Sequence, residues 1–168
     1  MKYLLTILGI FGLDFGVKGH IEKTTKEGSE KKLCGGLLLL RHHHNRGAFL
    51  NMGQKRQGVV AAVSVALSIV LTALFAGSLT LAGKGLLKWG LTLMLGGAYS
   101  NTYDRLKRRY VVDYVSFPVP FKALGRVIFN ISDFCIMIGA MLSVIGYLKE
   151  RLKNKIFQSR DLCLRALD

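Results

Sequence analysis

Cysteine and proline are both scarce in this sequence. Its three cysteines are Cys34, Cys135 and Cys163, an odd number at wide spacing and without a C-x-x-C pair. This pattern supports neither a disulfide framework nor a zinc site. Proline occurs only at positions 118 and 120, where it excludes a helix in the connection that contains it.

Acidic residues are also few, with 10 Asp and Glu against 24 Lys and Arg, so the formal net charge is +14. In a soluble protein this excess would suggest binding to nucleic acid. Here the basic residues flank apolar runs, and 51% of the residues are hydrophobic. We therefore interpret the charge as topology signals and as attraction to anionic membrane lipid, and we expect no nucleic-acid partner.

Long stretches of the chain lack charge, which is unusual for a soluble protein of 168 residues. The clearest is 58–83, with 26 consecutive uncharged and mostly apolar residues. The sequence predicts a mainly α-helical, multi-pass membrane protein with four spans, at about 1–17, 58–83, 86–103 and 127–148. The first could also be a signal peptide, but Asp14 interrupts it and no small-residue cleavage site follows. We expect a retained helix that ends near Lys18.

The segments between the spans differ in character. Leu33–Leu40 is a short apolar run typical of a strand, and Tyr110–Phe117 alternates β-branched and aromatic residues in an extended pattern. Residues 1–148 are expected to form one membrane-embedded domain. Residues 149–168 are basic and amphipathic, and they predict a cytoplasmic tail that lies as a surface helix beside anionic lipid.

Three adjacent histidines follow the first of these strands, in Arg41-His-His-His-Asn45. Histidine is a common metal ligand, but adjacent side chains do not converge, and metal sites favour spacings such as i, i+4. We therefore expect polar surface here, with no metal site and no cofactor.

Four spans would place both termini on one side of the membrane and the segments 18–57 and 104–126 together on the other. Nine Lys and Arg fall on the terminal side and fifteen on the opposite side. Charge counting alone would place the two polar segments in the cytoplasm. The rule weakens for long loops, so charge leaves the orientation undecided.

Two carboxylates, Asp113 and Asp133, lie 20 positions apart, each at the edge of an apolar stretch. Ionisable groups at such places are expensive and usually functional. If the connection folds back, the two can share a proton and serve as general acid and general base. Asn130 lies three residues before Asp133, while Asn101 and Arg105 share a helix face. The pattern is also compatible with a structural role, in which such residues cap helices or, like Asp104 beside Arg105, form ion pairs.

Five short motifs carry a resemblance to a known family. Gly96-Gly-Ala-Tyr-Ser-Asn-Thr-Tyr-Asp-Arg105, Val111-Val-Asp-Tyr114 and Phe129-Asn-Ile-Ser-Asp133 resemble the three C-terminal motifs of the bacterial lipoprotein signal peptidases. Asp14-Phe-Gly-Val-Lys18 resembles the family's Asp-Gln-x-Thr-Lys motif, of which it keeps Asp and Lys. Asn45-Arg-Gly-Ala-Phe49 resembles Asn-x-Gly-Ala-Ala-Phe, one residue shorter. Order, spacing and the four-span layout agree over nearly the whole chain.

The resemblance implies an aspartic endopeptidase with Asp113 and Asp133 as its catalytic pair. It implies supporting or substrate-binding roles for six further residues: Asp14, Lys18, Asn45, Asn101, Arg105 and Asn130. The family removes the signal peptide of diacylglyceryl-modified prolipoproteins, on the amino side of the lipidated Cys, at the outer face of the bacterial cytoplasmic membrane. It implies a small sheet built partly from 33–51, with the substrate beneath it, and we expect a monomer.

Two other functions stay open at this point. A catalytically weak paralogue would bind lipidated proteins or lipid without cleaving them. A small multi-pass transport or scaffold protein would use the carboxylates as a proton relay, and would show ion flux without a peptidase product.

Overall fold

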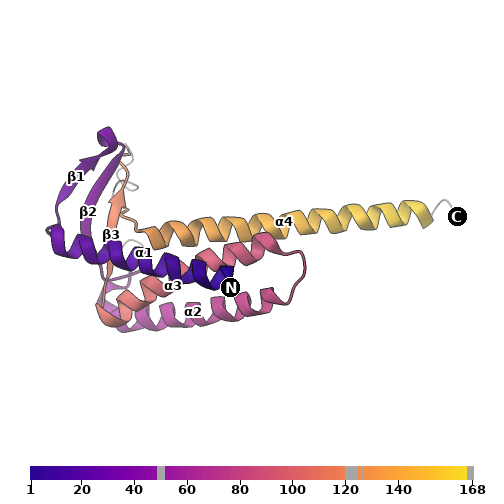
Figure 1. The fold of residues 1–168 in the computed structure, drawn as a ribbon, viewed down its shortest axis with the longest axis horizontal. Helices are drawn as coiled ribbons and strands as arrows, with labels where there is room; N and C mark the ends of the chain where they lie inside the picture. The colour runs from indigo at the N-terminus through magenta and orange to yellow at the C-terminus, as the bar shows by residue number, and fades with distance from the viewer. Residues whose placement is uncertain (49–51, 120–124, 126, 166–168) are drawn as a thin grey trace.

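A computed structural model describes residues 1–48, 52–119, 125 and 127–165. Phe49 of the shortened Asn45 motif lies outside the described residues, as do residues 120–124 of the predicted connection and residues 166–168 of the predicted tail. Four long helices run alongside one another, and a small sheet stands at one end of them (Figure 1). The helices are α1 (Lys2–Thr24), α2 (Gln57–Leu79), α3 (Gly85–Lys107) and α4 (Ile131–Arg165).

Helix α1 continues six residues beyond the predicted end at Lys18. The reason lies in the sheet: Ile21 is buried against Val112 and Tyr114, so the last turn of α1 has its own apolar contact. The helix ends where Thr25 adopts an extended conformation. Asp14 and Lys18 therefore lie one turn apart inside a helix, on the face that is turned toward the other helices.

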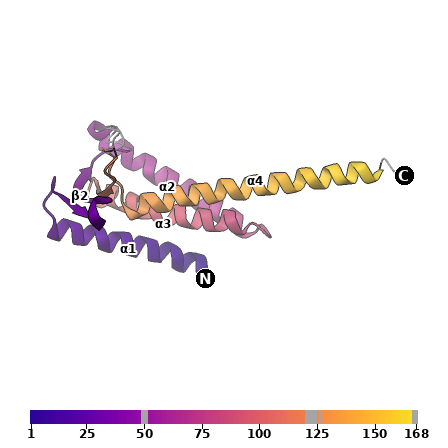
Figure 2. The same ribbon diagram turned by 90° about the horizontal axis from the view of Figure 1, so that it is seen from above.

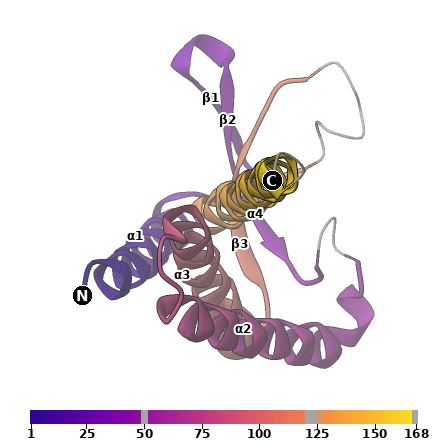
Figure 3. The same ribbon diagram turned by 90° about the vertical axis from the view of Figure 1, so that its right-hand side faces the viewer.

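Three helical segments are long and apolar enough to cross a membrane: Lys2–Thr24, Gln54–Leu79 and Ile131–Ile156. The predicted span at 86–103 is present as α3, so all four expected helices are there, but α3 is less apolar than the other three and is not among these segments. The physical reason is its position, because α3 packs against all three other helices and is central in the end-on view (Figure 3). A helix surrounded by protein can carry polar side chains that lipid would penalise.

Helix α4 runs unbroken through residue 148, where a boundary between span and tail was expected. It projects beyond the other three helices toward the C-terminus (Figures 1 and 2). The basic residues after Lys149 thus continue the helix, and no separate surface helix begins in the part of the tail that the structure describes. The proposed contact of the tail with anionic lipid stays a prediction.

The sheet has three antiparallel strands in the order β1 (Glu30–Leu33), β2 (Leu38–Asn45) and β3 (Val111–Ser116). The prediction of an extended segment at 110–117 is confirmed by β3. The single strand predicted over 33–40 is wrong, because that run contains the turn of a hairpin. Gly35 and Gly36 adopt positive φ there, which favours glycine, and they reverse the chain between β1 and β2.

Helices α3 and α4 approach each other closely through glycine. A Cβ at Gly90 would lie 2.5 Å from the carbonyl oxygen of Gly139, and one at Gly97 would lie 2.4 Å from that of Ser132. Small residues permit such backbone contact between membrane helices. This packing brings the sheet end of α3, with Asn101, next to the first turn of α4, with Asp133.

Candidate active site

Asp113 and Asp133 meet where β3 and the start of α4 come together. Asp113 lies in the middle of β3 and is 3% exposed, and Asp133 lies in the first turn of α4. Asn130 joins them: its Nδ2 donates to Asp113 Oδ1 (2.8 Å), and its backbone N–H donates to Asp133 Oδ2 (3.0 Å). The N–H of Asp133 donates in return to Asn130 Oδ1 (2.9 Å), which completes a reciprocal cap of the helix.

Two further amides complete the support of this carboxyl pair. Asn45 on β2 donates from Nδ2 to Asp113 Oδ2 (2.9 Å), and Asn101 on α3 donates from Nδ2 to Asp133 Oδ1 (2.9 Å). Each of the four carboxyl oxygens therefore accepts an N–H, and the donors come from three different parts of the chain. Such contacts fix the orientation of both carboxyl groups.

The pKa of Asp113 is raised to about 7, first by burial and second by the negative charge of Asp133. The amide donors Asn45 and Asn130 act against this by favouring the ionised form. Two neighbouring carboxyl groups in this condition hold one proton between them near neutral pH. One is then able to donate a proton while the other accepts one.

The carboxyl pair opens into a pocket of about 280 Å³. Its polar lining includes the pair itself with Asn45, Asn101 and Arg105. The opposite part of the wall is apolar and comes from the segment before α4 and from α4 itself: Val127, Ile128, Phe129, Ile136 and Met137. A cleft of this kind suits a mostly apolar extended ligand with one polar group at the carboxylates.

Arg105 lines the same pocket. Its guanidinium donates to the backbone carbonyl oxygens of Asn101 and Gly47, each at 3.4 Å. Its buried Nε has no hydrogen-bond partner among the described residues. A buried guanidinium N–H without a partner is costly, so Arg105 carries an unused donor at the wall of the pocket.

Asp14 and Lys18 lie behind the pocket and are fully buried. Lys18 Nζ contacts Asp14 Oδ2 at 2.6 Å and Asp104 Oδ2 at 3.0 Å, and it donates to Asn101 Oδ1 at 2.8 Å. Asn101 in turn donates to Asp133. These two residues of the first motif thus hold Asn101 in place, and we assign them to positioning rather than to contact with a substrate.

Asp104 pairs with Lys18 and, at 3.5 Å, with Nε of Arg108 one turn along α3. The alternative pairing with Arg105 is not the one adopted. Arg105 turns toward the pocket instead, where its hydrogen bonds to Asn101 and Gly47 hold it. Both aspartates around Lys18 therefore belong to a buried ionic cluster on the far side of Asn101.

Sequence reasoning missed three hydroxyl groups that bind Asp14. The hydroxyls of Ser100 and Ser132 each donate to Asp14 Oδ2 at 2.6 Å, and that of Tyr114 donates to Asp14 Oδ1 at 3.1 Å. Each lies inside one of the three C-terminal motifs, directly beside a residue that was singled out. Their position beside these residues could have marked the three hydroxyls as site residues, but nothing in the sequence predicted that they bind Asp14.

We expected the three histidines to form polar surface, but the structure buries His42 almost completely. They lie on β2, where side chains two residues apart point to the same face of the sheet. His42 is 3% exposed and His44 is 13% exposed, and both meet Glu22 at the end of α1. His43 points the other way and lines the pocket. Consecutive histidines diverge as expected, but His42 and His44, two residues apart, converge on one face of β2.

The chain is similar to known proteins over most of its length. Residues 6–149 match the family described as Signal peptidase (SPase) II. The lipoprotein signal peptidase of Lactiplantibacillus plantarum is 30% identical over 153 residues, which cover 88% of this chain and 95% of that protein. The lipoprotein signal peptidase of Caldicellulosiruptor bescii is 31% identical over 150 residues, covering 89% of this chain and 93% of that protein.

Two solved structures share the fold, and both are described as bacterial membrane enzymes. One, at 2.3 Å resolution, gives a TM-score of 0.78 with 24% identity and covers 89% of each chain. The other, at 1.9 Å resolution, gives 0.71 with 23% identity and covers 88% of this chain and 93% of its own. The three long apolar helices confirm the prediction of a membrane protein. The family match favours neither the transport or scaffold alternative nor the non-cleaving paralogue. The chain belongs to the signal peptidase II family of membrane peptidases.

Proposed function

We propose that this protein is an aspartic-type lipoprotein signal peptidase in which Asp113 and Asp133 are the catalytic residues. The observation that carries the proposal is the carboxyl pair joined by Asn130 at the polar end of an otherwise apolar pocket. The substrate would be a lipid-modified prolipoprotein, cut on the amino side of its lipidated Cys. The apolar wall of the pocket suits the hydrophobic part of a signal peptide.

The protonation of the pair suggests which carboxyl group is the general acid and which is the general base. Asp113, whose pKa is raised to about 7, would hold the proton and act as the general acid. Asp133 would be the general base, because it lies in the first turn of α4, where the positive end of the helix favours the ionised carboxylate. Water bound between them would lose a proton to Asp133 and attack the scissile carbonyl carbon, while Asp113 protonates the carbonyl oxygen.

The second half of the reaction returns the pair to its starting state. Asp133 passes its new proton to the peptide nitrogen as the C–N bond breaks. Asp113 takes a proton from one hydroxyl of the tetrahedral intermediate, and the new carboxyl group forms. Arg105 would donate to a backbone carbonyl of the substrate through its guanidinium group, which lines the pocket. This scheme uses only acid–base chemistry at two carboxyl groups.

The site lies at the sheet end of the helices, near the predicted interface between lipid and water. We place this end at the outer face of a bacterial cytoplasmic membrane, on the strength of the family resemblance, with the protein acting as a monomer. The two polar segments, 18–57 and 104–126, then face the same side, since both contribute strands to one sheet.

The test is cleavage of a lipidated prolipoprotein by purified enzyme in detergent. Asp113→Asn and Asp133→Asn should each lower the cleavage rate by about 10²–10⁴-fold or more, because an amide cannot take up or release the proton. The double variant should be little worse, since the two residues act on one proton. Substrate cross-linking should persist in both single variants. Asp104→Asn is the control aspartate: it should reduce stability more than the chemical step. Full activity in either Asp113→Asn or Asp133→Asn would contradict the proposal.

A further inference from the structure

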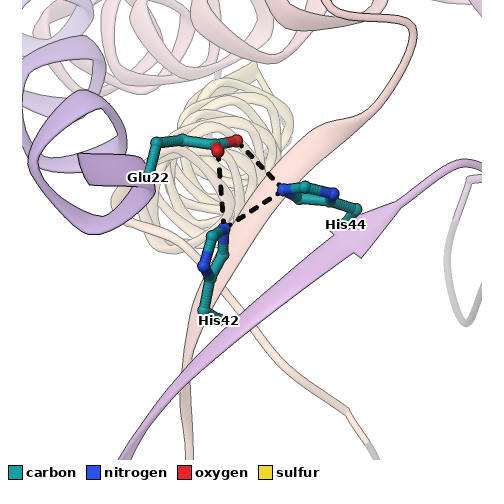
Figure 4. A group of neighbouring side chains, drawn as sticks. All are labelled: Glu22, His42 and His44. Carbon is teal, nitrogen blue, oxygen red and sulfur yellow. Dashed lines mark hydrogen bonds and ion pairs between the residues drawn. The ribbon is translucent and has the colours of Figure 1, made fainter. Parts of the chain in front are cut away.

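A second cluster of ionisable side chains lies on the face of β2 that is turned away from the pocket. Glu22 from the last turn of α1 meets His42 and His44 (Figure 4). The two Nε2 atoms are 3.1 Å apart, Glu22 Oε1 lies 3.1 Å from Nε2 of His44, and Glu22 Oε2 lies 3.7 Å from Nε2 of His42. The cluster joins two segments 20 residues or more apart in the chain, and the peptidase mechanism does not use it.

The outer ring nitrogens reveal where the protons are. His42 Nδ1 lies 2.7 Å from the carbonyl oxygen of Thr25, and His44 Nδ1 lies 3.2 Å from a carboxylate oxygen of Glu27. Carbonyl and carboxylate oxygens only accept hydrogen bonds, so both Nδ1 atoms carry a proton. In two neutral rings, both Nε2 atoms then present lone pairs toward each other and toward the Glu22 carboxylate. Electron-rich atoms that converge in this way are stabilised by a positive charge between them, either a metal ion or a proton.

The spacing fits a metal ion. Zinc binds histidine nitrogen and carboxylate oxygen at 2.0–2.2 Å, and two ligands at a tetrahedral angle are then roughly 3.3 Å apart. The separations of His44 Nε2 from His42 Nε2 and from Glu22 Oε1 are both 3.1 Å, close to that value, and the other carboxylate oxygen lies 3.7 Å from His42 Nε2. The contacts of both Nδ1 atoms are the outer hydrogen bonds that metal-bound histidines typically make, to a backbone carbonyl and to a carboxylate.

We propose that Glu22, His42 and His44 bind one Zn²⁺ ion, with Glu27 and the Thr25 carbonyl orienting the two imidazoles. Two imidazoles and a carboxylate suit zinc better than Ca²⁺ or Mg²⁺, which prefer sites made of oxygen alone. Glu22 and Glu27 supply two negative charges, and Arg108, with Nη1 4.0 Å from Glu22, supplies one positive charge beside them. A divalent cation is therefore compatible with the local charge.

The ion would be structural for the sheet. It would clamp the end of α1 to β2, the strand that also carries Asn45, the amide donor to Asp113. Tyr110 stacks on the His44 ring at a centroid distance of 3.9 Å and shields that ligand. The competing explanation is an additional proton in place of the metal ion. Nε2 of His44 would carry this proton and donate it to Nε2 of His42 and to Glu22. That arrangement needs no metal, so the two explanations are separated by metal binding itself.

The experiment uses the full chain, purified in detergent without a polyhistidine tag and freed of metal with a chelator. Equilibrium dialysis against Zn²⁺, with metal content measured by mass spectrometry, should give one ion per chain. His42→Gln with His44→Gln should abolish this binding, and Glu27→Gln should weaken it by 10–100-fold as an outer contact. The matched control is His20→Gln, the same change at an exposed histidine on α1, which should bind zinc as the wild type does.

Two measurements on the unaltered protein keep the test independent of how well the variants fold. Co²⁺ should give the intense visible absorption of a tetrahedral site, and Zn²⁺ should raise the thermal midpoint in proportion to its saturation of the site. Wild-type protein that takes up no stoichiometric Zn²⁺ would overturn the proposal and favour the additional proton. Equal binding by a folded His42→Gln/His44→Gln protein would overturn it as well. Neither result depends on whether the protein cleaves prolipoproteins.

Discussion

Replacement of Lys18 by methionine should be among the most damaging changes outside the pocket. The Lys18 ammonium is fully buried and contacts two carboxylates that are at most 1% exposed, those of Asp14 and Asp104. Asp14 keeps three hydroxyl donors without it, but Asp104 Oδ2 has no hydrogen bond of its own within the described part of the chain. Lys18→Met therefore leaves Asp104 with Arg108 as its remaining cation, at 3.5 Å from Oδ1, and leaves the buried Oδ2 without a partner.

The size of the effect follows from this geometry. Removing one partner of a buried ion pair costs about 3–5 kcal/mol, and the Arg108 contact to Asp104 should keep the loss near the lower end of that range. For a chain of this length such a loss lowers the thermal midpoint by roughly 10 °C. The loss of the contact to Asn101 should also let Asp133 shift, and a misplaced catalytic group costs up to about 10²-fold in rate.

The assay is thermal unfolding in detergent, followed by Trp89 fluorescence, together with the cleavage rate well below the midpoint. Lys23→Met is the matched control, the same change at an exposed lysine of α1, and it should stay within about 0.5 kcal/mol of the wild type. Adding Asp104→Asn to Lys18→Met should recover stability, because it removes the charge of the carboxylate that has lost its lysine. A Lys18→Met protein as stable as Lys23→Met, or a double variant that loses the sum of both effects, would refute this reasoning.

Four further predictions concern the site and its orientation. Asp113→Asn should be more stable than the wild type at pH 8, by up to roughly 4 kcal/mol. In the wild type, the unfolded chain releases the Asp113 proton above pH 3.8, whereas the folded protein keeps it until about pH 7. The difference in unfolding free energy should therefore close near pH 4, and a difference that does not change with pH would contradict the prediction. Asn130→Ala should lose cleavage and about 1 kcal/mol of stability, whereas Asn130→Ser should recover the helix cap but not the cleavage, as measured by the same two assays. EDTA should leave the cleavage rate of the His42→Gln/His44→Gln protein unchanged, and a rate that disappears with chelator in that variant would argue against a purely aspartic mechanism. An impermeant maleimide should label the exposed native Cys34 on intact cells, with Cys34→Ser as the control, and labelling only after permeabilisation would place the sheet in the cytoplasm.

The sequence alone determined the features that depend on local pattern. The uncharged run at 58–83 predicted α2, because a helix that faces lipid must be apolar along its length. The alternation at 110–117 predicted β3, because strand side chains alternate between faces. The motifs around Asp113 and Asp133 predicted a carboxyl pair, which the structure brings to one pocket. Each of these inferences uses residues close together in the chain or a pattern with a fixed spacing.

Only the tertiary structure decided what the long-range partners are. Lys18 donates to Ser100 and Asn101, 82 and 83 positions away, and Asp14 accepts from Ser132, 118 positions away. The polar character of α3 was likewise tolerable only because three helices surround it. His42 and His44 met Glu22 because the chain forms a hairpin strand there and α1 extends to Thr24, two facts set by packing against β3. Sequence spacing fixes which side chains share a face, whereas the packing of that face decides what they touch.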